Sequence, residues 1–216
     1  MDRFSEPGAI QRARSMIQWA TSVKRRRRAG AGQGLVEFAL VIPIFLVMLI
    51  AIIEFSLTFN ALLSINFASR EAALIAAEAG NGTGADCVIL RKVEASVTAP
   101  ARTANITQVR IYQSTRGGGV IGGKVNVYSR SGSMSCTFPD RTSMTVPYSL
   151  AGALGYPDST RCNVVLGCAG SGGVDHVGVE VSYVYSWQTP LASLLNWLGT
   201  GYTMVKGNAM RMEPVL

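Results

Sequence analysis

Sixteen consecutive residues, 38–53, carry no polar side chain: Phe-Ala-Leu-Val-Ile-Pro-Ile-Phe-Leu-Val-Met-Leu-Ile-Ala-Ile-Ile. Apart from Glu54, no charged residue follows before Arg70. A helix that crosses the bilayer core needs ~20 mostly apolar residues at about 1.5 Å each, and Leu35 to about Phe59 is long enough. A buried helix of a soluble protein is the alternative, but a run that is apolar on every side lacks the amphipathic stripe of such a helix. The sequence therefore predicts a transmembrane helix.

The net charge of +7 is concentrated at the N-terminus. Residues 1–34 hold eight basic and two acidic residues, whereas residues 35–216 hold twelve basic and eleven acidic residues. A generally basic, nucleic-acid-binding domain is therefore excluded. The basic cluster Lys24 to Arg28 shortly precedes the apolar run, and the far side of the run has no such cluster. The positive-inside rule therefore predicts a single-pass protein of the cell membrane, with a cytoplasmic N-terminus and the remainder outside. A secretory signal peptide is the competing interpretation, but its apolar region is shorter, about 7–15 residues, and no Ala-x-Ala cleavage site stands clearly at the far end of this run.

The residues around the start of the apolar run carry a family resemblance. Gly32-Gln33-Gly34-Leu35-Val36-Glu37, followed by Phe38-Ala39-Leu40-Val41-Ile42-Pro43 and Ile52-Ile53-Glu54-Phe55, resembles the N-terminal signature of the TadE-like proteins. These are pseudopilin-related components of the tight-adherence (Flp-type) pilus system. A weaker resemblance to the closing strands of the family lies in residues 179–183 and 208–213.

The resemblance implies processing by a prepilin peptidase between Gly32 and Gln33. Glycine lets an extended backbone enter a protease cleft without a side-chain clash. Glu37 then becomes the fifth residue of the mature chain, and its carboxylate is expected to pair with the new N-terminal amine of a neighbouring subunit, because a charge in low dielectric is tolerated only when paired. The alternative is that the glycines form a flexible joint and that Glu37 is simply interfacial.

A second glutamate lies at the far end of the apolar run. Glu54 is 17 residues beyond Glu37, roughly 26 Å along a straight helix and close to the ~30 Å hydrocarbon thickness. We expect Glu54 to be solvated at the outer interface; a packing contact between protomers is the alternative role. Pro43 removes one helical hydrogen bond and predicts a kink.

The helix is expected to continue beyond the membrane. From Phe59 to Ala79 apolar residues and strong helix formers alternate with polar ones, until Gly80-Asn81-Gly82 ends the pattern. One helix of about 45 residues results, lipid-embedded first and amphipathic later. We therefore divide the chain into a cytoplasmic leader (1–32), a transmembrane and amphipathic helix (33–79) and an extracytoplasmic head (80–216).

The head is predicted to belong to the α+β class, with an antiparallel sheet packed on the long helix as in pilins. Residues 129–173, rich in Ser, Gly and Pro, are expected to form loops. The remaining elements follow from hydrophobic periodicity: helices at Cys87 to Val97 and Thr189 to Trp197, and strands at Thr107 to Gln113, Lys124 to Tyr128, Val177 to Trp187 and Tyr202 to Met210.

All four cysteines lie in the head: Cys87, Cys136, Cys162 and Cys168. An even number outside the cytoplasm favours two disulfides, for which three pairings exist. We favour a local Cys162–Cys168 bridge with Cys87 joined to Cys136. A metal site is the rival, but no C-x-x-C pair is present and His176 is the only histidine.

Two resemblances to catalytic motifs fail on their context. Gly117 to Gly122 fits G-x-G-x-x-G, but a strand-like segment follows instead of a helix, so no helix N-terminus is offered to a phosphate. Asp175-His176 lacks the G-x-S-x-G element of a hydrolase. We therefore expect no catalytic residue, metal or cofactor.

Three function classes remain. The first is a structural, pseudopilin-like component of a tight-adherence pilus assembly or secretion system. Its expected partners are membrane lipid, other pilus subunits, assembly-platform proteins and the prepilin peptidase. The second is a permanently anchored binding or adhesion module, and the third is an anchored enzyme, for which no convergent nucleophile and base are found. Cleavage after Gly32 separates the first class from the second.

Overall fold

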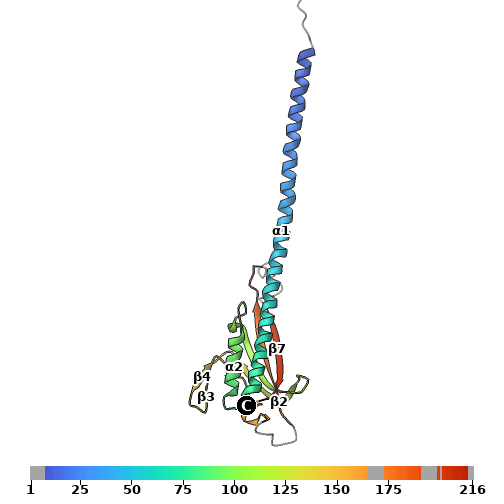
Figure 1. The fold of residues 1–216 in the computed structure, drawn as a ribbon. Helices are drawn as coiled ribbons and strands as arrows, with labels where there is room; N and C mark the ends of the chain where they lie inside the picture. The colour runs from blue at the N-terminus through green and yellow to red at the C-terminus, as the bar shows by residue number, and fades with distance from the viewer. Residues whose placement is uncertain (1–7, 165–172, 191–198, 200, 214–216) are drawn as a thin grey trace, which may run out of the picture. The chain divides into compact units, whose positions relative to one another are not determined.

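The computed structural model describes residues 8–164, 173–190, 199 and 201–213, with the backbone alone for residues 8–31. The chain divides into two compact units, Met1–Ile52 and Ile53–Leu216. The boundary falls inside the first helix, so the last part of that helix belongs to the same unit as the head. Figure 1 shows the ribbon of each unit.

Helix α1 spans Gly8–Ala79 and contains Pro43 without being ended by it. The sequence placed the start of this helix near residue 33, whereas the helical backbone begins 25 residues earlier, at Gly8. Basic residues are good helix formers, which allows the leader to continue the helix. The end at Ala79 is as predicted: Gly80 takes a φ of 58°, a left-handed conformation that favours glycine and closes a helix.

The head is built on a five-stranded sheet of strand order β5-β2-β1-β6-β7 in which every paired neighbour is antiparallel. A separate two-stranded sheet pairs β3 with β4. Two short 3-10 turns connect elements at Thr103–Asn105 and Asp158–Thr160. The remaining elements are α2 (Ala85–Ser96), β1 (Ile106–Ser114), β2 (Val120–Ser129), β3 (Met134–Thr137), β4 (Ser143–Val146), β5 (Ser149–Leu150), β6 (His176–Ser186) and β7 (Gly201–Arg211).

One hydrophobic core joins the C-terminal part of α1, helix α2 and the sheet. The buried face of α1 consists mainly of alanines, which recur every three or four residues and allow the helix backbone to approach the sheet closely. An ion pair of 3.2 Å between Lys92 of α2 and Glu71 of α1 links the two helices. The buried hydrophobic residues of α1 are Ala61, Ile65, Ala68, Ala72, Ala73, Ala76 and Ala77.

This arrangement confirms the α+β, pilin-like fold with a long apolar helix on an antiparallel sheet. Helix α2 and strands β1, β2, β6 and β7 lie within a few residues of their predicted positions. The prediction of loops over residues 129–173 is wrong in part, because β3, β4 and β5 lie there. These strands have two to four residues each and are too short to show an alternation of their own. The helix predicted at Thr189 to Trp197 falls on residues 191–198, which lie outside the described residues.

Candidate functional site: the membrane helix and its junction with the head

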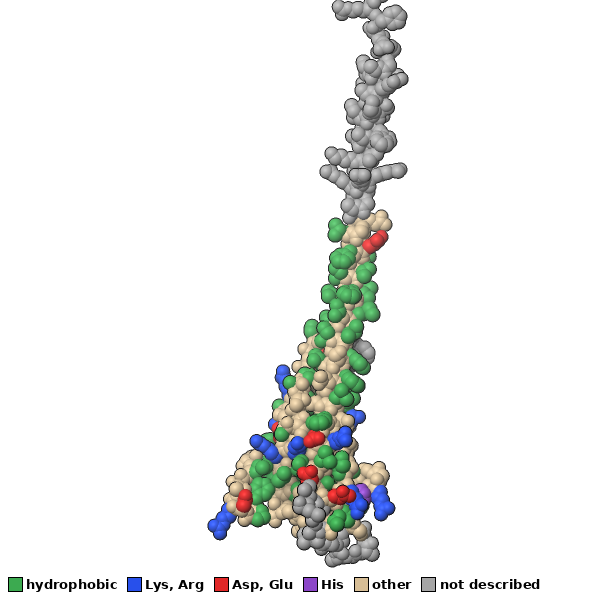
Figure 2. Space-filling model, viewed as in Figure 1, with side chains coloured by type: hydrophobic (Ala, Val, Ile, Leu, Met, Phe, Trp, Pro, Cys, Tyr) green, Lys and Arg blue, Asp and Glu red, His purple; other side chains and the backbone are tan. Residues whose placement is uncertain are grey.

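The apolar part of α1 is exposed along its whole length. Within the described residues, one helix, Gly32–Ala79, is long and apolar enough to cross a membrane. Many large side chains of its apolar run, among them Leu35, Phe45 and Ile52, are more than half exposed. Figure 2 shows hydrophobic side chains along the helix on the face in view. A surface of this kind is stable in lipid and not in water.

Gly32 and Gln33 are adjacent in α1, and Glu37 lies one helical turn further along. Gly32 and Gly34 are helical, and a Cβ added at either position would meet no atom within 4 Å. The amide Nε2 of Gln33 donates a hydrogen bond of 3.3 Å to the exposed carboxylate of Glu37. Side chains four residues apart share one face of a helix. The predicted new N-terminal residue and the predicted assembly glutamate therefore lie on the same face.

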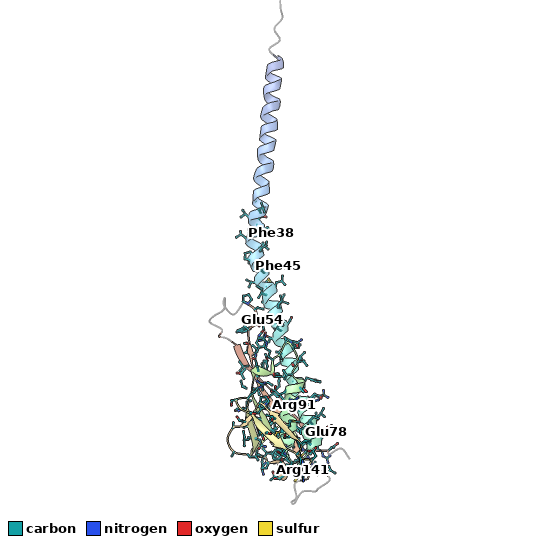
Figure 3. The ribbon with its side chains drawn as sticks, turned by 90° about the vertical axis from the view of Figure 1, so that its left-hand side faces the viewer. Phe38, Phe45, Glu54, Glu78, Arg91 and Arg141 are labelled. Carbon is teal, nitrogen blue, oxygen red and sulfur yellow. A yellow bond between two sulfur atoms is a disulfide. The ribbon has the colours of Figure 1, made fainter. Side chains whose placement is uncertain are left out.

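Glu54 differs from the expectation of a solvated side chain, because only 3% of it is exposed. The hydroxyl of Tyr185, at the end of β6, donates to Glu54 Oε1 at 2.6 Å. The backbone N–H groups of Gln188 and Thr189 donate to Oε1 and Oε2 at 3.1 and 2.9 Å. Figure 3 labels Glu54 on α1 beside the end of the sheet. The carboxylate thus attaches the end of β6 and the residues after it to the helix.

The tyrosine that donates to Glu54 has a raised pKa. Burial, followed by the hydrogen bond to Glu54, raises the pKa of Tyr185 to about 12. The Tyr185 hydroxyl therefore keeps its proton and its role as a donor throughout the physiological range.

Of the predicted disulfides, Cys87–Cys136 is present and joins α2 to β3 with a Cα–Cα distance of 6.3 Å. Cys168 lies outside the described residues, so the Cys162–Cys168 pairing stays a prediction. Disulfides of this kind belong to oxidising compartments, in agreement with the predicted position of the head outside the cytoplasm.

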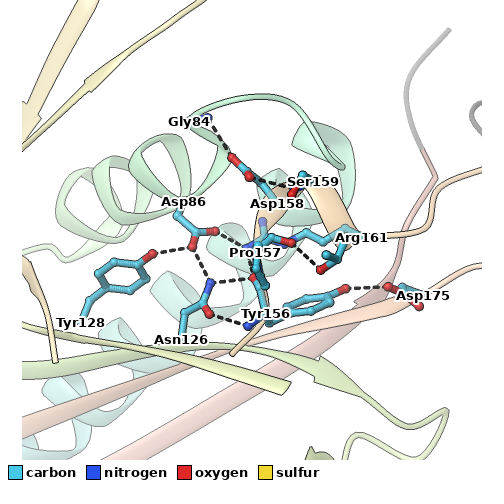
Figure 4. Close-up of polar contacts among 11 residues, drawn as sticks. Gly84, Asp86, Asn126, Tyr128, Tyr156, Pro157, Asp158, Ser159, Arg161 and Asp175 are labelled. Atoms are coloured by element: carbon cyan, nitrogen blue, oxygen red, sulfur yellow. Dashed lines mark hydrogen bonds and ion pairs between the residues drawn. The ribbon is translucent and has the colours of Figure 1, made fainter. Parts of the chain in front are cut away.

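A buried polar network that the sequence analysis missed fixes the loop before β6 to α2 and the sheet (Figure 4). Asp86 of α2 pairs with Arg161 and accepts hydrogen bonds from Asn126 (2.8 Å) and Tyr128 (2.5 Å). Asn126 also binds the backbone N–H and carbonyl of Tyr156, both at 2.7 Å. No signal in the sequence indicated this network, because Asn126 lies between Val125 and Val127 and alternation alone places it on the polar face of β2.

Asp175 and His176, considered above as part of a hydrolase site, have structural surroundings. The carboxylate of Asp175 accepts hydrogen bonds from Gln113 Nε2 (2.6 Å), the Tyr156 hydroxyl (2.9 Å) and the N–H of Cys162 (3.1 Å). His176 is the first residue of β6 and pairs with Arg211 in the ladder of β6 and β7. These contacts occupy Asp175 in holding the loop before β6.

Fold and site together define a pilin-like class of protein: an α+β head on an N-terminal apolar helix suited to a single membrane anchor. Comparison with known families agrees with this class. Residues 32–74 match the TadE-like protein family, which is associated with assembly of the tight-adherence (Tad) pilus. The chain therefore carries a TadE-like domain over the apolar run and part of the helix segment that packs on the sheet. Comparisons with curated proteins and with solved structures give no match.

Proposed function

We propose that this protein is a pseudopilin-like, non-enzymatic component of a tight-adherence pilus assembly or secretion system. In this proposal its N-terminus is cytoplasmic, its head lies outside the cytoplasm, and a prepilin peptidase removes the leader after Gly32. The observation that carries the proposal is the TadE-like match over residues 32–74, which begins at Gly32 and includes Glu37 and the apolar run. Other pilus subunits and assembly-platform proteins would be its partners.

The glycines of the leader junction support cleavage there. Gly30, Gly32 and Gly34 all lie within α1, where each glycine costs about 1 kcal/mol relative to alanine. Local unwinding of this segment is therefore easier than elsewhere in the helix. An unwound segment without side chains at alternate positions fits an extended protease cleft.

The position of Glu37 supports a role in assembly. Its carboxylate is exposed and lies one helical turn from Gln33. Cleavage would place a new amine on Gln33 at the edge of the hydrocarbon region, where an unpaired charge is costly. Pairing of this amine with Glu37 of a neighbouring subunit would offset that cost and set the stagger between two helices.

Substitution at Gly32 and Glu37 tests the proposal. Gly32→Leu should block cleavage, because the added side chain would obstruct the peptidase, while the space around Gly32 leaves the chain itself undisturbed. Gly34→Leu is the matched control, since its surroundings are equally open, and it should still be cut. Glu37→Ala should be cut normally but should reduce the number of pili. The readouts are the size of the protein on immunoblots and a count of surface pili in cells that carry the matching peptidase. Normal cleavage of Gly32→Leu would contradict the assigned site.

A further inference from the structure

Three aromatic side chains gather where β6 ends and β7 begins. Tyr185, Trp187 and Tyr202 form an aromatic cluster with ring centroids 5.7–6.2 Å apart. The indole N–H of Trp187 donates to the carbonyl of Gly199 at 3.0 Å. Tyr202 is 39% exposed, so the cluster reaches the surface of the head.

The aromatic cluster is attached to α1 at the residue that follows the apolar run. Tyr185 donates its hydroxyl to Glu54, and the N–H groups just beyond Trp187 donate to the same carboxylate. On the helix itself, Phe55 and Phe59 stack with centroids 6.4 Å apart and are 71% and 50% exposed. Aromatic side chains from the helix and from the sheet thus lie at one level of this unit.

Charge disappears from both strands at the same level. The sequence has no Lys, Arg, Asp or Glu in the 25 residues from Val181 to Val205, although 15% of the chain is charged. The flanking charges are brought together by the ladder, in which Glu180 pairs with Gly207 and Val181 with Lys206. The parts of β6 and β7 that follow this pair, residues 181–186 and 201–205, carry no charged side chain.

The length of the bilayer core places this level near the outer membrane surface. A hydrocarbon thickness of ~30 Å corresponds to about 20 helical residues. If Glu37 lies at the inner boundary, the outer boundary falls near Leu57, between Phe55 and Phe59. Glu54 then lies close to lipid, where a carboxylate is tolerated when it is paired with donors, as the three hydrogen bonds to it provide.

We propose that the paired ends of β6 and β7 at this level, with the exposed Tyr202 and the half-buried Trp187 that follows β6, are a second membrane contact that holds the head against the outer leaflet. Tyrosine and tryptophan favour the headgroup region because each combines an apolar ring with a polar group. The absence of charge avoids a desolvation cost and fits a zwitterionic bilayer. Attachment to a helix that enters the same bilayer keeps these strand ends at a high effective concentration near lipid. The inference requires that α1 spans a membrane and is independent of the proposed role in pilus assembly.

Tryptophan fluorescence tests the proposal on the full chain. Trp19→Phe with Trp197→Phe leaves Trp187 as the single reporter. The control chain lacks all three tryptophans and carries Ile121→Trp on β2. Ile121 lies at the end of the sheet opposite to Tyr185, because its neighbour Val120 pairs with Ser114, and Ser114 pairs with His176 at the start of β6. Each chain is placed in phosphatidylcholine nanodiscs, one copy per disc, with lipids brominated near the headgroup end of the acyl chain.

We expect the bromolipids to quench Trp187 at least about twofold more than the control tryptophan, as expected for an interfacial indole. Lipids brominated near the terminal methyl should quench it less. Equal quenching of the two reporters, or quenching of Trp187 by aqueous acrylamide alone, would overturn the proposal.

A second measurement needs no substitution. A phosphatidylcholine with a photoreactive group near its headgroup should label peptides that contain Trp187 or Tyr202 in the wild-type chain, and should leave the turn between β1 and β2 unlabelled. Equal labelling of both regions, or labelling confined to α1, would also overturn the proposal. Loss of piliation plays no part in either readout, so failure of the pilus assignment would remain distinguishable.

Discussion

The carboxylate of Glu54 joins helix α1 to the C-terminal end of strand β6. Its position directly after an apolar run suggests a solvated residue at a membrane surface, and the sequence alone gives no reason to think otherwise. The three donors lie 131–135 residues away along the chain. No local pattern encodes such a contact, because it depends on how β6 packs on α1. The sequence predicted that Glu54 lies at the outer end of the apolar run, but it did not predict that Glu54 is buried against the head.

Removal of one donor to Glu54 should weaken the head. Tyr185→Phe deletes a hydrogen bond of 2.6 Å and leaves a buried carboxylate with two donors, so the free energy of unfolding should fall by about 1.5–3 kcal/mol. Tyr202→Phe, a matched change in the same aromatic cluster at a 39% exposed position, should stay within about 0.5 kcal/mol of wild type. Denaturant unfolding of the detergent-solubilised chain, followed by near-UV circular dichroism, measures both. Equal losses in the two variants would argue against the role given to Glu54.

Buried tyrosines predict how stability depends on pH. Burial, with the carboxylates of Asp86, Glu94 and Asp175 as further causes, raises the pKa values of Tyr128, Tyr148 and Tyr156 above the ordinary 10.0. Above this pH the unfolded chain loses tyrosine protons that the folded chain keeps, so stability present below about pH 10 should be lost as the pH rises.

The variant Tyr148→Phe isolates one of these contributions. Tyr148 donates to Glu94 at 2.6 Å. Each such tyrosine makes the free energy of unfolding fall by about 1.4 kcal/mol more per pH unit above about pH 10. Between about pH 10 and about pH 12, the slope measured for Tyr148→Phe should therefore be shallower than the wild-type slope by about 1.4 kcal/mol per pH unit. Unfolding free energies at several pH values in this range provide the test. Parallel pH profiles for the two proteins would show that Tyr148 does not carry the effect.

At the level of secondary structure, predictability followed length and alternation. Strands β1, β2, β6 and β7 have nine to eleven residues with alternating apolar positions, and the sequence predicted all four. The two-residue strand β5 pairs with Tyr128 and Ser129, the last two residues of β2. The extended conformation of β5 therefore depends on this pairing. The early start of α1 was missed because the boundary at residue 33 was taken from the predicted cleavage site and not from the helix propensity of the leader.

The Cys87–Cys136 bridge should stabilise the small β3–β4 sheet and its contact with α2. It closes a sequence separation of 49 residues, which corresponds to about 3–4 kcal/mol in the chain-entropy estimate. The double variant Cys87→Ala with Cys136→Ala should unfold at correspondingly lower denaturant concentration. Mass spectrometry of non-reduced peptides tests the pairing itself and the predicted Cys162–Cys168 bridge. Peptides that join Cys87 to any other cysteine would contradict the pairing.

For the whole molecule, the charge distribution predicts the orientation in the membrane. The basic cluster precedes the apolar run and the nearly neutral head follows it, so residues 80–216 should lie outside the cytoplasm. Protease added to spheroplasts should digest the head and leave residues 1–30 of any unprocessed chain protected. Antibodies against the two regions distinguish the products. Digestion of the leader with a protected head would reverse the assigned orientation.

If this protein is a processed, pseudopilin-like pilus component, its N-terminus in native cells is the one that a prepilin peptidase leaves. N-terminal sequencing and intact mass of the wild-type protein, purified from piliated cells that contain the matching prepilin peptidase, measure it. We expect a chain that begins at Gln33 and keeps 184 of its 216 residues. A chain that still carries Gly32 and the basic leader in such cells would show that the leader is not removed, and would favour a permanently anchored binding module.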